Sequence, residues 1–434
     1  MRSEWKLTLA AALGWLGTPA WAQQPLEAFV RAASERATDV QIAQVDTRSA
    51  RADRLGSVGG LLPQLSMTGG YTRNQQAVEA SFPVEDGSLQ TATIQAKDQL
   101  DATARVELAL VDLPAWSHYL ASDRRVLAAE AQQIAVRTQV VGAVVESWFR
   151  HASARRVEAA TQTAQRTAEE VLAAVESREQ AGLATVLDVE RSRADVARAQ
   201  QRAAEAELEV ALSRRQLEVL SGLTPAGEDA EVPDPRGEDG PLESWIARID
   251  QVPAVRAAEA TVRAARSDTV SASTQLLPAV SAFATERWTN AAGFGPDFLW
   301  SAGVQARWNL DLVRPAELEA RSAARARADL VARQARETAA TTLHDSWVRV
   351  RSLSVRVQAA RRAEEASTRA ATIARARYDA GTGSALELSQ AERDRFDAEV
   401  ERIRADADLH VARRSLRLAA GLPPDPTLSA GGTP

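Results

Sequence analysis

The chain has 434 residues, no cysteine and a formal net charge of -6 at pH 7. Without cysteine it can form neither disulfides nor cysteine metal sites, and it cannot use a cysteine nucleophile. A modestly acidic protein also lacks the basic surface that binds nucleic acid, so we exclude nucleic acid as a partner.

The first residues have the pattern of a secretory signal peptide. Arg2 and Lys6 give a basic start, an apolar stretch follows at 7–16, and Ala20-Trp21-Ala22 supplies the small residues of a cleavage site. We expect a signal peptide at 1–22, removed by cleavage after Ala22. Its apolar stretch is too short to span a bilayer.

An internal repeat organises the rest of the chain. Several residue groups recur at one constant spacing, which chance agreement between two Ala/Arg-rich segments would not produce. The matched groups are Asp112-Leu113 and Asp311-Leu312, Ser147-Trp148 and Ser346-Trp347, Arg178 and Arg377, Ala181-Gly182 and Ala380-Gly381, and Gly222-Leu223 and Gly421-Leu422.

Each repeat is expected to contain a helix, a β-hairpin and two long helices. In the first repeat, 23–223, we place these elements at about 26–58, 61–113, 114–180 and 185–221. In the second repeat, 251–422, we place them at about 251–275, 276–313, 315–380 and 384–420. A Pro/Gly-rich linker or equatorial segment, 224–250, joins the repeats, and a C-terminal tail, 423–434, follows them.

The strand predictions rest on alternation of apolar and polar residues. Alternation is clear around Leu65–Thr72, Arg105–Leu110 and Val304–Leu312. It is weakest after Pro278, because Phe283 breaks it. The first hairpin is the longer one, and we place its extra residues in a loop at about 79–98.

The helix predictions rest on composition and spacing. Ala, Arg, Glu, Gln and Leu dominate, and all are good helix formers. Apolar residues recur every seventh position, as in a coiled-coil seam, at Leu120, Leu127, Ile134, Val141 and Trp148. A helix of about 67 residues rises ~100 Å, far more than a globular core needs.

The strand count predicts an oligomer. No apolar run after Ala22 is long enough for a membrane helix, so entry into a membrane requires a closed β-barrel. Four strands of about 9–11 residues per chain cannot close one, because the smallest barrels have about eight. Two chains would give eight strands and a filled interior, whereas three would give twelve and leave room for a channel. We therefore expect a mainly α protein with a transmembrane β-barrel. Four strands per chain contribute to a twelve-stranded trimeric barrel, and long antiparallel helices form an α-barrel tunnel.

Two glycine turns carry a resemblance to a known family. Ala181–Val189 resembles the first periplasmic turn of the outer-membrane efflux protein family, of which TolC is the best-known member. Tyr378–Thr382, followed by Leu386-Glu387-Leu388, resembles the second. The resemblance covers essentially the whole mature chain.

The resemblance implies a homotrimer in the outer-membrane lipid of a bacterium, with a tunnel that projects into the periplasm. It implies a passive duct without catalytic residues, metal or cofactor. It further implies a periplasmic adaptor (membrane fusion) protein and an inner-membrane transporter as partners. The turn residues expected to contact the adaptor are Gly182, Leu183, Thr185, Gly381, Thr382 and Ser384.

The resemblance also implies a gate at the periplasmic end of the tunnel. The gate tyrosine falls on Tyr378 and its carboxylate partner on Asp188, while the acidic ring of the aperture falls on Glu387 and Gln390. The best-studied member has an arginine where this chain has Gly383, and an acid where it has Gln390. A looser or differently latched gate is therefore expected.

Glu387 supports two interpretations. Three copies near a pore axis would repel one another and favour cations. Alternatively, a solvated acid at a helix start interacts favourably with the helix dipole.

Two other functions compete with the duct. A periplasmic coiled-coil scaffold or adaptor would have long helices without paired strands of membrane length. An exported enzyme is disfavoured, because the four histidines have no metal-ligand spacing and no phosphate-binding or nucleophile motif occurs. The exported substrate and the class of pump stay open.

Overall fold

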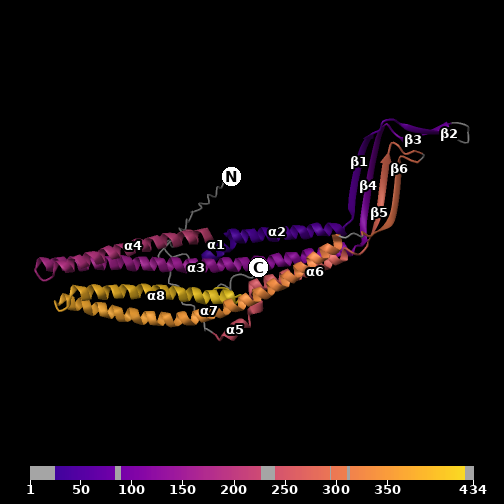
Figure 1. Cartoon of the computed structure of the whole chain (residues 1–434). Coiled ribbons are helices and arrows are strands. Elements are labelled where there is room, and N and C mark those ends of the chain that lie inside the picture. The colour runs from indigo at the N-terminus through magenta and orange to yellow at the C-terminus, as the bar shows by residue number, and fades with distance from the viewer. Residues whose placement is uncertain (1–24, 84–88, 226–239, 294, 310–312, 426–434) are drawn as a thin grey trace, which may run out of the picture. The chain divides into compact units, whose positions relative to one another are not determined.

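The computed structural model describes residues 25–83, 89–225, 240–293, 295–309 and 313–425 (Figure 1). The expected signal peptide at 1–22, most of the linker, the end of the tail and Asp311-Leu312 lie outside the described residues.

The chain forms two compact units, and the two longest helices contribute to both. The sheet unit comprises Thr38–Thr138 and Leu242–His344. The hairpin unit comprises the chain up to Ala37 together with Gln139–Pro241 and Asp345–Pro434. Each unit therefore combines segments of both sequence repeats, so the repeats are not themselves the compact units.

The sheet unit is built around an antiparallel sheet of strand order β1-β4-β5-β6. These strands are β1 (Gln64–Arg73), β4 (Asp98–Val111), β5 (Ala279–Thr289) and β6 (Phe298–Arg307). The helices of the unit are α2 (Thr38–Val58), α5 (Leu242–Ile246), α6 (Pro253–Thr274) and the first parts of α3 (Leu113–Gln180) and α7 (Val313–Asp379). Short 3-10 turns at Gly59–Leu61 and Ile249–Gln251 complete it.

The predicted loop at 79–98 was wrong, because these residues form a second hairpin. Strands β2 (Val78–Pro83) and β3 (Leu89–Gln95) pair antiparallel in a separate two-stranded sheet. The segment is rich in Val, Phe, Thr and Ile, residues that favour strands. Gly293 at the end of the other hairpin donates its N–H to the Thr93 carbonyl at 2.9 Å.

Strand β6 begins and ends earlier than the alternation at Val304–Leu312 predicted. It pairs along nearly the whole of β5, from Ala279 opposite Arg307 to Trp288 opposite Phe298. The partner strand therefore sets its extent. Beyond the strand, the Trp308 indole N–H donates to the Leu276 carbonyl at 3.1 Å.

The predicted helix at 26–58 is two helices, α1 (Leu26–Arg36) and α2. The chain leaves helical conformation at Ala37, whose ψ is 134°. Helix α1 buries Leu26, Phe29 and Ala33 and belongs to the hairpin unit, whereas α2 belongs to the sheet unit. The linker also contains α5 and a 3-10 turn before Pro253 opens α6.

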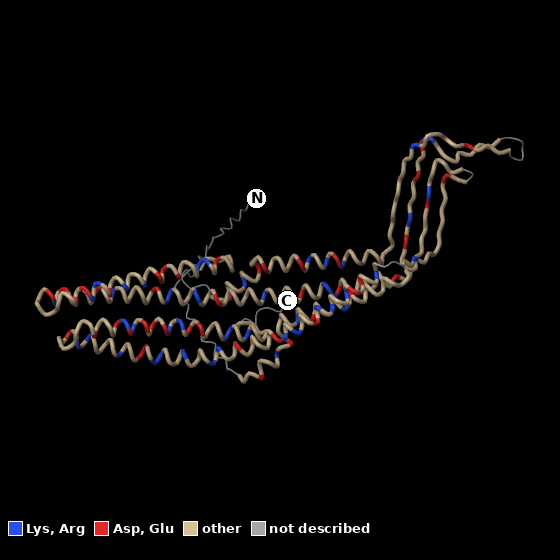
Figure 2. The backbone as a smooth tube through the Cα atoms, in the orientation of Figure 1, with Lys and Arg blue, Asp and Glu red and all other residues tan. Residues whose placement is uncertain are grey.

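The hairpin unit consists mainly of two antiparallel helical hairpins. One joins α3 to α4 (Val186–Ser221), and the other joins α7 to α8 (Ala385–Ala419), as Figure 1 shows. Charged residues of both signs follow one another along all of these helices (Figure 2). Many pair between helices, for example Arg356 on α7 with Glu401 on α8 at 2.7 Å. No described helix has an apolar stretch long enough to cross a membrane.

The predicted seven-residue seam on α3 is buried over only part of its length. Val141 and Trp148, in the hairpin unit, are buried, whereas Leu120, Leu127 and Ile134, in the sheet unit, are exposed.

The core of the hairpin unit also holds Arg414, whose guanidinium carbon lies 4.7 Å from the centre of the Phe149 ring.

The glycines that recur in the repeat have one backbone role. Gly182, Gly222, Gly381 and Gly421 all have φ between 68° and 74°, a left-handed conformation that glycine adopts without strain. Each follows the end of a long helix, which explains why these positions keep their register between the repeats.

We expect Gly182→Ala to destabilise the folded protein by about 1 kcal/mol, because a Cβ disfavours the left-handed conformation. The space around Gly182 is open, so steric overlap adds nothing. The matched control is Gly56→Ala, which lies inside α2 with equally open space and without a positive φ. Circular dichroism during urea unfolding should give a lower midpoint for Gly182→Ala and an unchanged or higher one for Gly56→Ala. Equal midpoint shifts would contradict the assignment.

Candidate functional site

The turns that end the two helical hairpins contain the residues that sequence analysis selected. In the first turn, Leu183 donates its N–H to the Arg178 carbonyl at 2.7 Å, and in the second, Thr382 donates to the Arg377 carbonyl at 2.9 Å. The turns differ in chemistry. Leu183 is 78% exposed at the first turn, whereas Thr382 occupies the equivalent place at the second.

Each turn leads into a capped helix. The Thr185 side chain accepts the Asp188 N–H, and the Asp188 carboxylate accepts the Thr185 N–H at 3.1 Å and its hydroxyl at 2.7 Å. The bond from the Thr185 hydroxyl lowers the pKa of Asp188, and the bond from its backbone adds to this. At the other turn the Ser384 hydroxyl accepts the Glu387 N–H at 3.2 Å. Glu387 is exposed and lies 3.8 Å from Arg377, while Gln390 is also exposed.

Tyr378 lies in an apolar cluster that joins the two hairpins. It is 4% exposed and packs with Val171, Val175, Val189 and Leu388, which come from α3, α4 and α8. Burial raises the pKa of Tyr378, and the nearby Arg178 charge opposes this effect.

The expected pairing of Tyr378 with Asp188 is not a hydrogen bond in this structure. Asp188 raises the pKa of Tyr378 through its charge, so the two groups are close enough to interact electrostatically. The Tyr378 hydroxyl, however, has no hydrogen-bond partner among the described residues. The Asp188 carboxylate is occupied by the helix cap.

Arg178 is a site residue that sequence analysis did not select. Its guanidinium carbon lies 3.8 Å from the centre of the Tyr378 ring, and its Nη2 donates to the Tyr378 carbonyl. The available signal was the match of Arg178 to Arg377 in the repeat, which places an arginine in the last turn of both α3 and α7.

Gly383 is held in a confined place. A Cβ at this position would lie 3.1 Å from the Arg377 Cβ and from the Tyr378 nitrogen. The chain therefore packs so closely here that a longer side chain at this position would require the turn to move.

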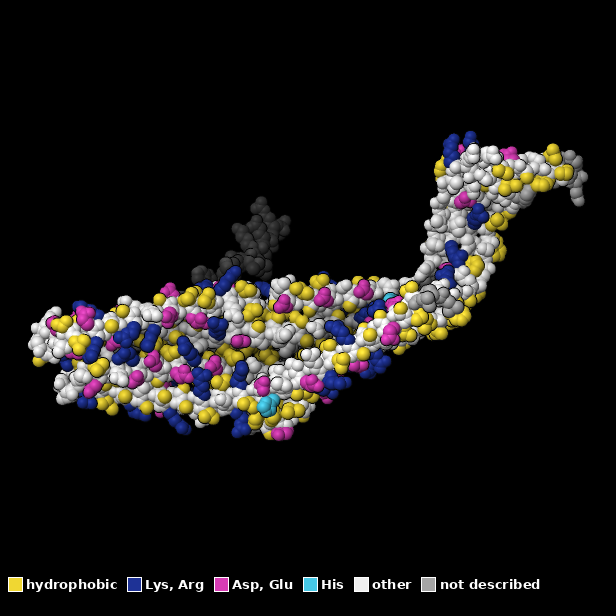
Figure 3. All heavy atoms as spheres, in the orientation of Figure 1, with side chains coloured by type: hydrophobic (Ala, Val, Ile, Leu, Met, Phe, Trp, Pro, Cys, Tyr) yellow, Lys and Arg dark blue, Asp and Glu magenta, His cyan; other side chains and the backbone are white. Residues whose placement is uncertain are grey.

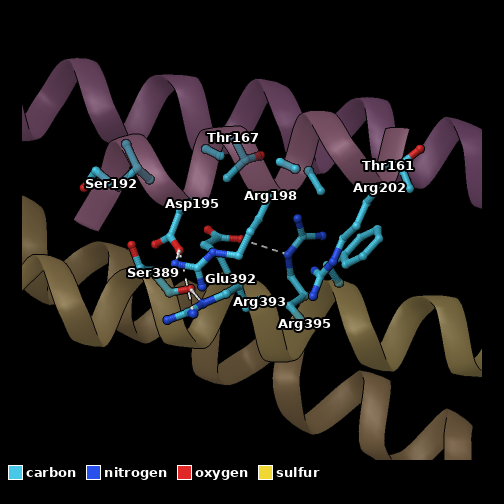
Figure 4. Close-up of a pocket in the computed structure, with 15 residues that line it drawn as sticks. Thr161, Thr167, Ser192, Asp195, Arg198, Arg202, Ser389, Glu392, Arg393 and Arg395 are labelled. Atoms are coloured by element: carbon cyan, nitrogen blue, oxygen red, sulfur yellow. Dashed lines mark hydrogen bonds and ion pairs between the residues drawn. The ribbon is translucent and has the colours of Figure 1, made fainter. Parts of the chain in front are cut away.

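A small cavity of about 110 Å³ lies among α3, α4 and α8 close to the turns (Figure 4). Its charged residues pair with one another: Asp195 lies 3.2 Å from Arg198 and 3.7 Å from Arg393, and Glu392 lies 3.0 Å from Arg395. Throughout the described part of the chain, no group of His, Asp or Glu is arranged to hold a metal ion. The pair of Asp195 and Arg393 connects α4 with α8, and the other two pairs lie within one helix.

The four-stranded sheet has one apolar face. Register places Leu65 opposite Val106, Ala282 opposite Val304 and Trp288 opposite Phe298 on this side. Many of these side chains are exposed, with Trp300 at 81%. Hydrophobic side chains over the strands are visible in Figure 3. Apart from the pair Arg73 and Asp98 at the rim, Glu286 is the one charged residue on this face of the described strands.

The opposite face of the sheet carries a polar network. Glu107 accepts hydrogen bonds from Ser281 at 2.7 Å and from Gln305 at 2.8 Å, and Arg105 donates to Gln305 at 3.1 Å. Phe283, which broke the alternation in the sequence, lies on this polar face beneath Arg105, 4.6 Å from its guanidinium carbon. An apolar exposed face and a polar opposite face are the arrangement of a membrane barrel wall.

Comparison with known proteins agrees with this geometry. A model of a protein family described as "Outer membrane efflux protein" matches residues 29–223 and 249–422. The chain belongs to the outer membrane efflux protein family. No curated protein sequence matches it.

Solved outer-membrane channels share the fold. The chain is similar to the CmeC channel of Campylobacter jejuni, with 16% identity and a TM-score of 0.76 over 96% of this chain and 94% of CmeC. It is similar to VceC of Vibrio cholerae, with 16% identity and a TM-score of 0.74 over 92% of this chain and 97% of VceC. Similarity to the open state of MtrE of Neisseria gonorrhoeae gives 18% identity and a TM-score of 0.68 over 93% of this chain and 91% of MtrE.

These findings confirm the predicted family, fold class and transport function. The protein is a bacterial outer-membrane efflux channel of the trimeric kind, with a helical tunnel and strands that form the barrel, and it is not an enzyme. The alternative of a periplasmic scaffold without a barrel is set aside.

We expect Val304→Arg to impair membrane assembly, because it places a charge on the apolar face at a cost of about 2–4 kcal/mol near the bilayer midplane. Ser301→Arg is the matched control on the same strand, since Ser301 lies on the polar face opposite Thr285. Trimer yield in outer-membrane fractions should fall for Val304→Arg and stay near wild type for Ser301→Arg. The reverse order would mean that the faces are assigned incorrectly.

Proposed function

We propose that this channel is the outer-membrane component of a tripartite efflux or export system. In this system a periplasmic adaptor and an inner-membrane transporter deliver substrates to the tunnel. The observation that carries the proposal is the pair of capped glycine turns at the ends of the helical hairpins, within a chain of the efflux family. A passive channel has no energy source of its own, so the energy for export comes from a partner.

The first turn offers the better surface for an adaptor. Leu183, Val186 and Leu187 are all exposed around it, whereas the second turn has Gly381, Thr382 and Ser384 and one exposed leucine, Leu386. An exposed apolar patch is typical of a surface that another protein covers. Gly182 and Thr185 hold the first patch in its shape through the left-handed turn and the helix cap.

A photo-cross-linking amino acid at Leu183 should capture the adaptor in intact cells. We expect a cross-linked product that contains a periplasmic adaptor, identified by mass spectrometry. Leu208 on α4 is the control, because it is also an exposed leucine but lies more than twenty residues along the helix. An equal product from Leu208, or none from Leu183, would contradict adaptor contact at this turn.

The aperture of the tunnel is proposed to lie at the start of α8. Glu387 and Gln390 would line it, with Tyr378 and Asp188 beside it in the gate. Three exposed copies of Glu387 near the pore axis would attract cations. Arg377 lies 3.8 Å from Glu387 and offsets part of this charge.

Glu387→Gln should lower the preference of the channel for K⁺ over Cl⁻, since it removes three carboxylates from the ring. The measurement is the reversal potential of single channels in a planar bilayer with a KCl gradient. Glu401→Gln serves as control, because Glu401 lies on the same helix and pairs with Arg356 at 2.7 Å. If both variants keep the wild-type reversal potential, Glu387 is a solvated helix-start acid.

A further inference from the structure

The two helical hairpins of one chain are connected at their ends by an arginine and a tyrosine ring. Arg178 lies in the last turn of α3 and Tyr378 in the last turn of α7. The guanidinium carbon of Arg178 is 3.8 Å from the ring centre, and its Nη2 donates to the Tyr378 carbonyl. The same side chain therefore binds both the ring and the backbone of one residue on the other hairpin.

The equivalent arginine of the second repeat makes different contacts. Arg377 lies 3.8 Å from Glu387 and donates to the Thr382 carbonyl at 3.5 Å, both in its own hairpin. Arg178 thus crosses between the hairpins, whereas Arg377 does not. This difference gives a matched pair of arginines for testing.

Apart from the apolar cluster around Tyr378, other candidates for a polar connection at this place are occupied or absent. Asp188 accepts two hydrogen bonds from Thr185, and Gly383 has no side chain. The Tyr378 hydroxyl has no hydrogen-bond partner within the described residues, so it adds no polar link in this state.

Among the described residues, three ion pairs also cross between the hairpins, and every side chain in them except Asp195 is more than a third exposed. They are Arg375 with Glu170 at 3.8 Å, Arg393 with Asp195 at 3.7 Å, and Arg202 with Asp397 at 3.4 Å. Salt screens exposed pairs of this kind, and they contribute little to stability. Arg202 also lies over a buried ring on the other hairpin, 5.3 Å from the centre of Phe396, but the 3.8 Å contact of Arg178 with the Tyr378 ring is closer. A cation over a buried aromatic face is screened less than an exposed ion pair.

We propose that Arg178 is the positioning residue that holds the aperture closed. Gly383 has no side chain and cannot fill this role. The inference rests on the proposed gated duct. Movement of α7 and α8 away from α3 and α4 must separate the guanidinium from the Tyr378 ring and carbonyl. The aperture therefore opens only when this contact breaks.

The test uses full-length trimers in planar bilayers, with single-channel conductance and open probability as readouts. Arg178→Ala should raise the open probability several-fold, and Arg178→Lys should give a smaller increase because an ammonium cannot stack as a planar guanidinium does. Arg377→Ala, the matched control, should raise the open probability less than Arg178→Ala does, because its contacts lie within its own hairpin. Tyr378→Ala should raise it as Arg178→Ala does, and Tyr378→Phe should raise it less than Tyr378→Ala, because the ring and the carbonyl remain.

Each contrary result has a distinct meaning. If the wild type is closed and Arg178→Ala leaves the open probability unchanged, the latch is overturned. It is also overturned if Arg377→Ala raises the open probability as much as Arg178→Ala does. Opening by Tyr378→Phe alone overturns it in favour of a bond from the tyrosine hydroxyl, such as one to Asp188. A wild-type trimer that conducts fully at rest overturns the closed aperture itself. Wild-type melting temperature and trimer content in Arg178→Ala show that its effect is on the gate rather than on folding.

Discussion

Backbone hydrogen bonding inside a bilayer is the constraint on which the rest of this molecule depends. Every N–H and C=O group within the hydrocarbon needs a partner, and the order β1-β4-β5-β6 leaves the outer edges of β1 and β6 without a neighbouring strand among the described residues. In water the apolar face would expose Trp300 and Val304, and in lipid the edges would stay open. Joining these edges to those of two further copies pairs the open edges, and lipid covers the apolar face, so a trimeric barrel satisfies both requirements.

The long helix α3 is packed within the chain over only part of its length. On α3 one seven-residue pattern is buried at Val141 and Trp148 but exposed at Leu120, Leu127 and Ile134. A heptad seam that is apolar throughout is stabilised by a helical neighbour along its whole length. The chain supplies that neighbour in the hairpin unit, whereas the exposed part in the sheet unit has none among the described residues.

Local patterns made most of the elements predictable, while partners decided the rest. Turn glycines such as Gly182 and the cap at Thr185 act within a few residues, so the sequence reveals them directly. The extent of β6 depends on β5, and the polar position of Phe283 depends on Arg105 on a neighbouring strand. These long-range pairings leave no trace in a short window of sequence. For the same reason the family pattern pointed to Tyr378 and Asp188, but the contact with Arg178 became visible only in the fold.

Duplication followed by divergence of the turns explains why only one of two equivalent arginines crosses between the hairpins. In the second turn both Thr382 and Gly383 donate their N–H groups to the Arg377 carbonyl, and Gly383 packs against Arg377 itself. The turn is folded over its arginine, whose guanidinium is directed to Thr382 and Glu387. In the first turn only Leu183 donates to the Arg178 carbonyl, and the Arg178 guanidinium extends to Tyr378. The closer second turn therefore keeps its arginine local, while the Tyr378 carbonyl accepts a hydrogen bond from Arg178 of the other hairpin.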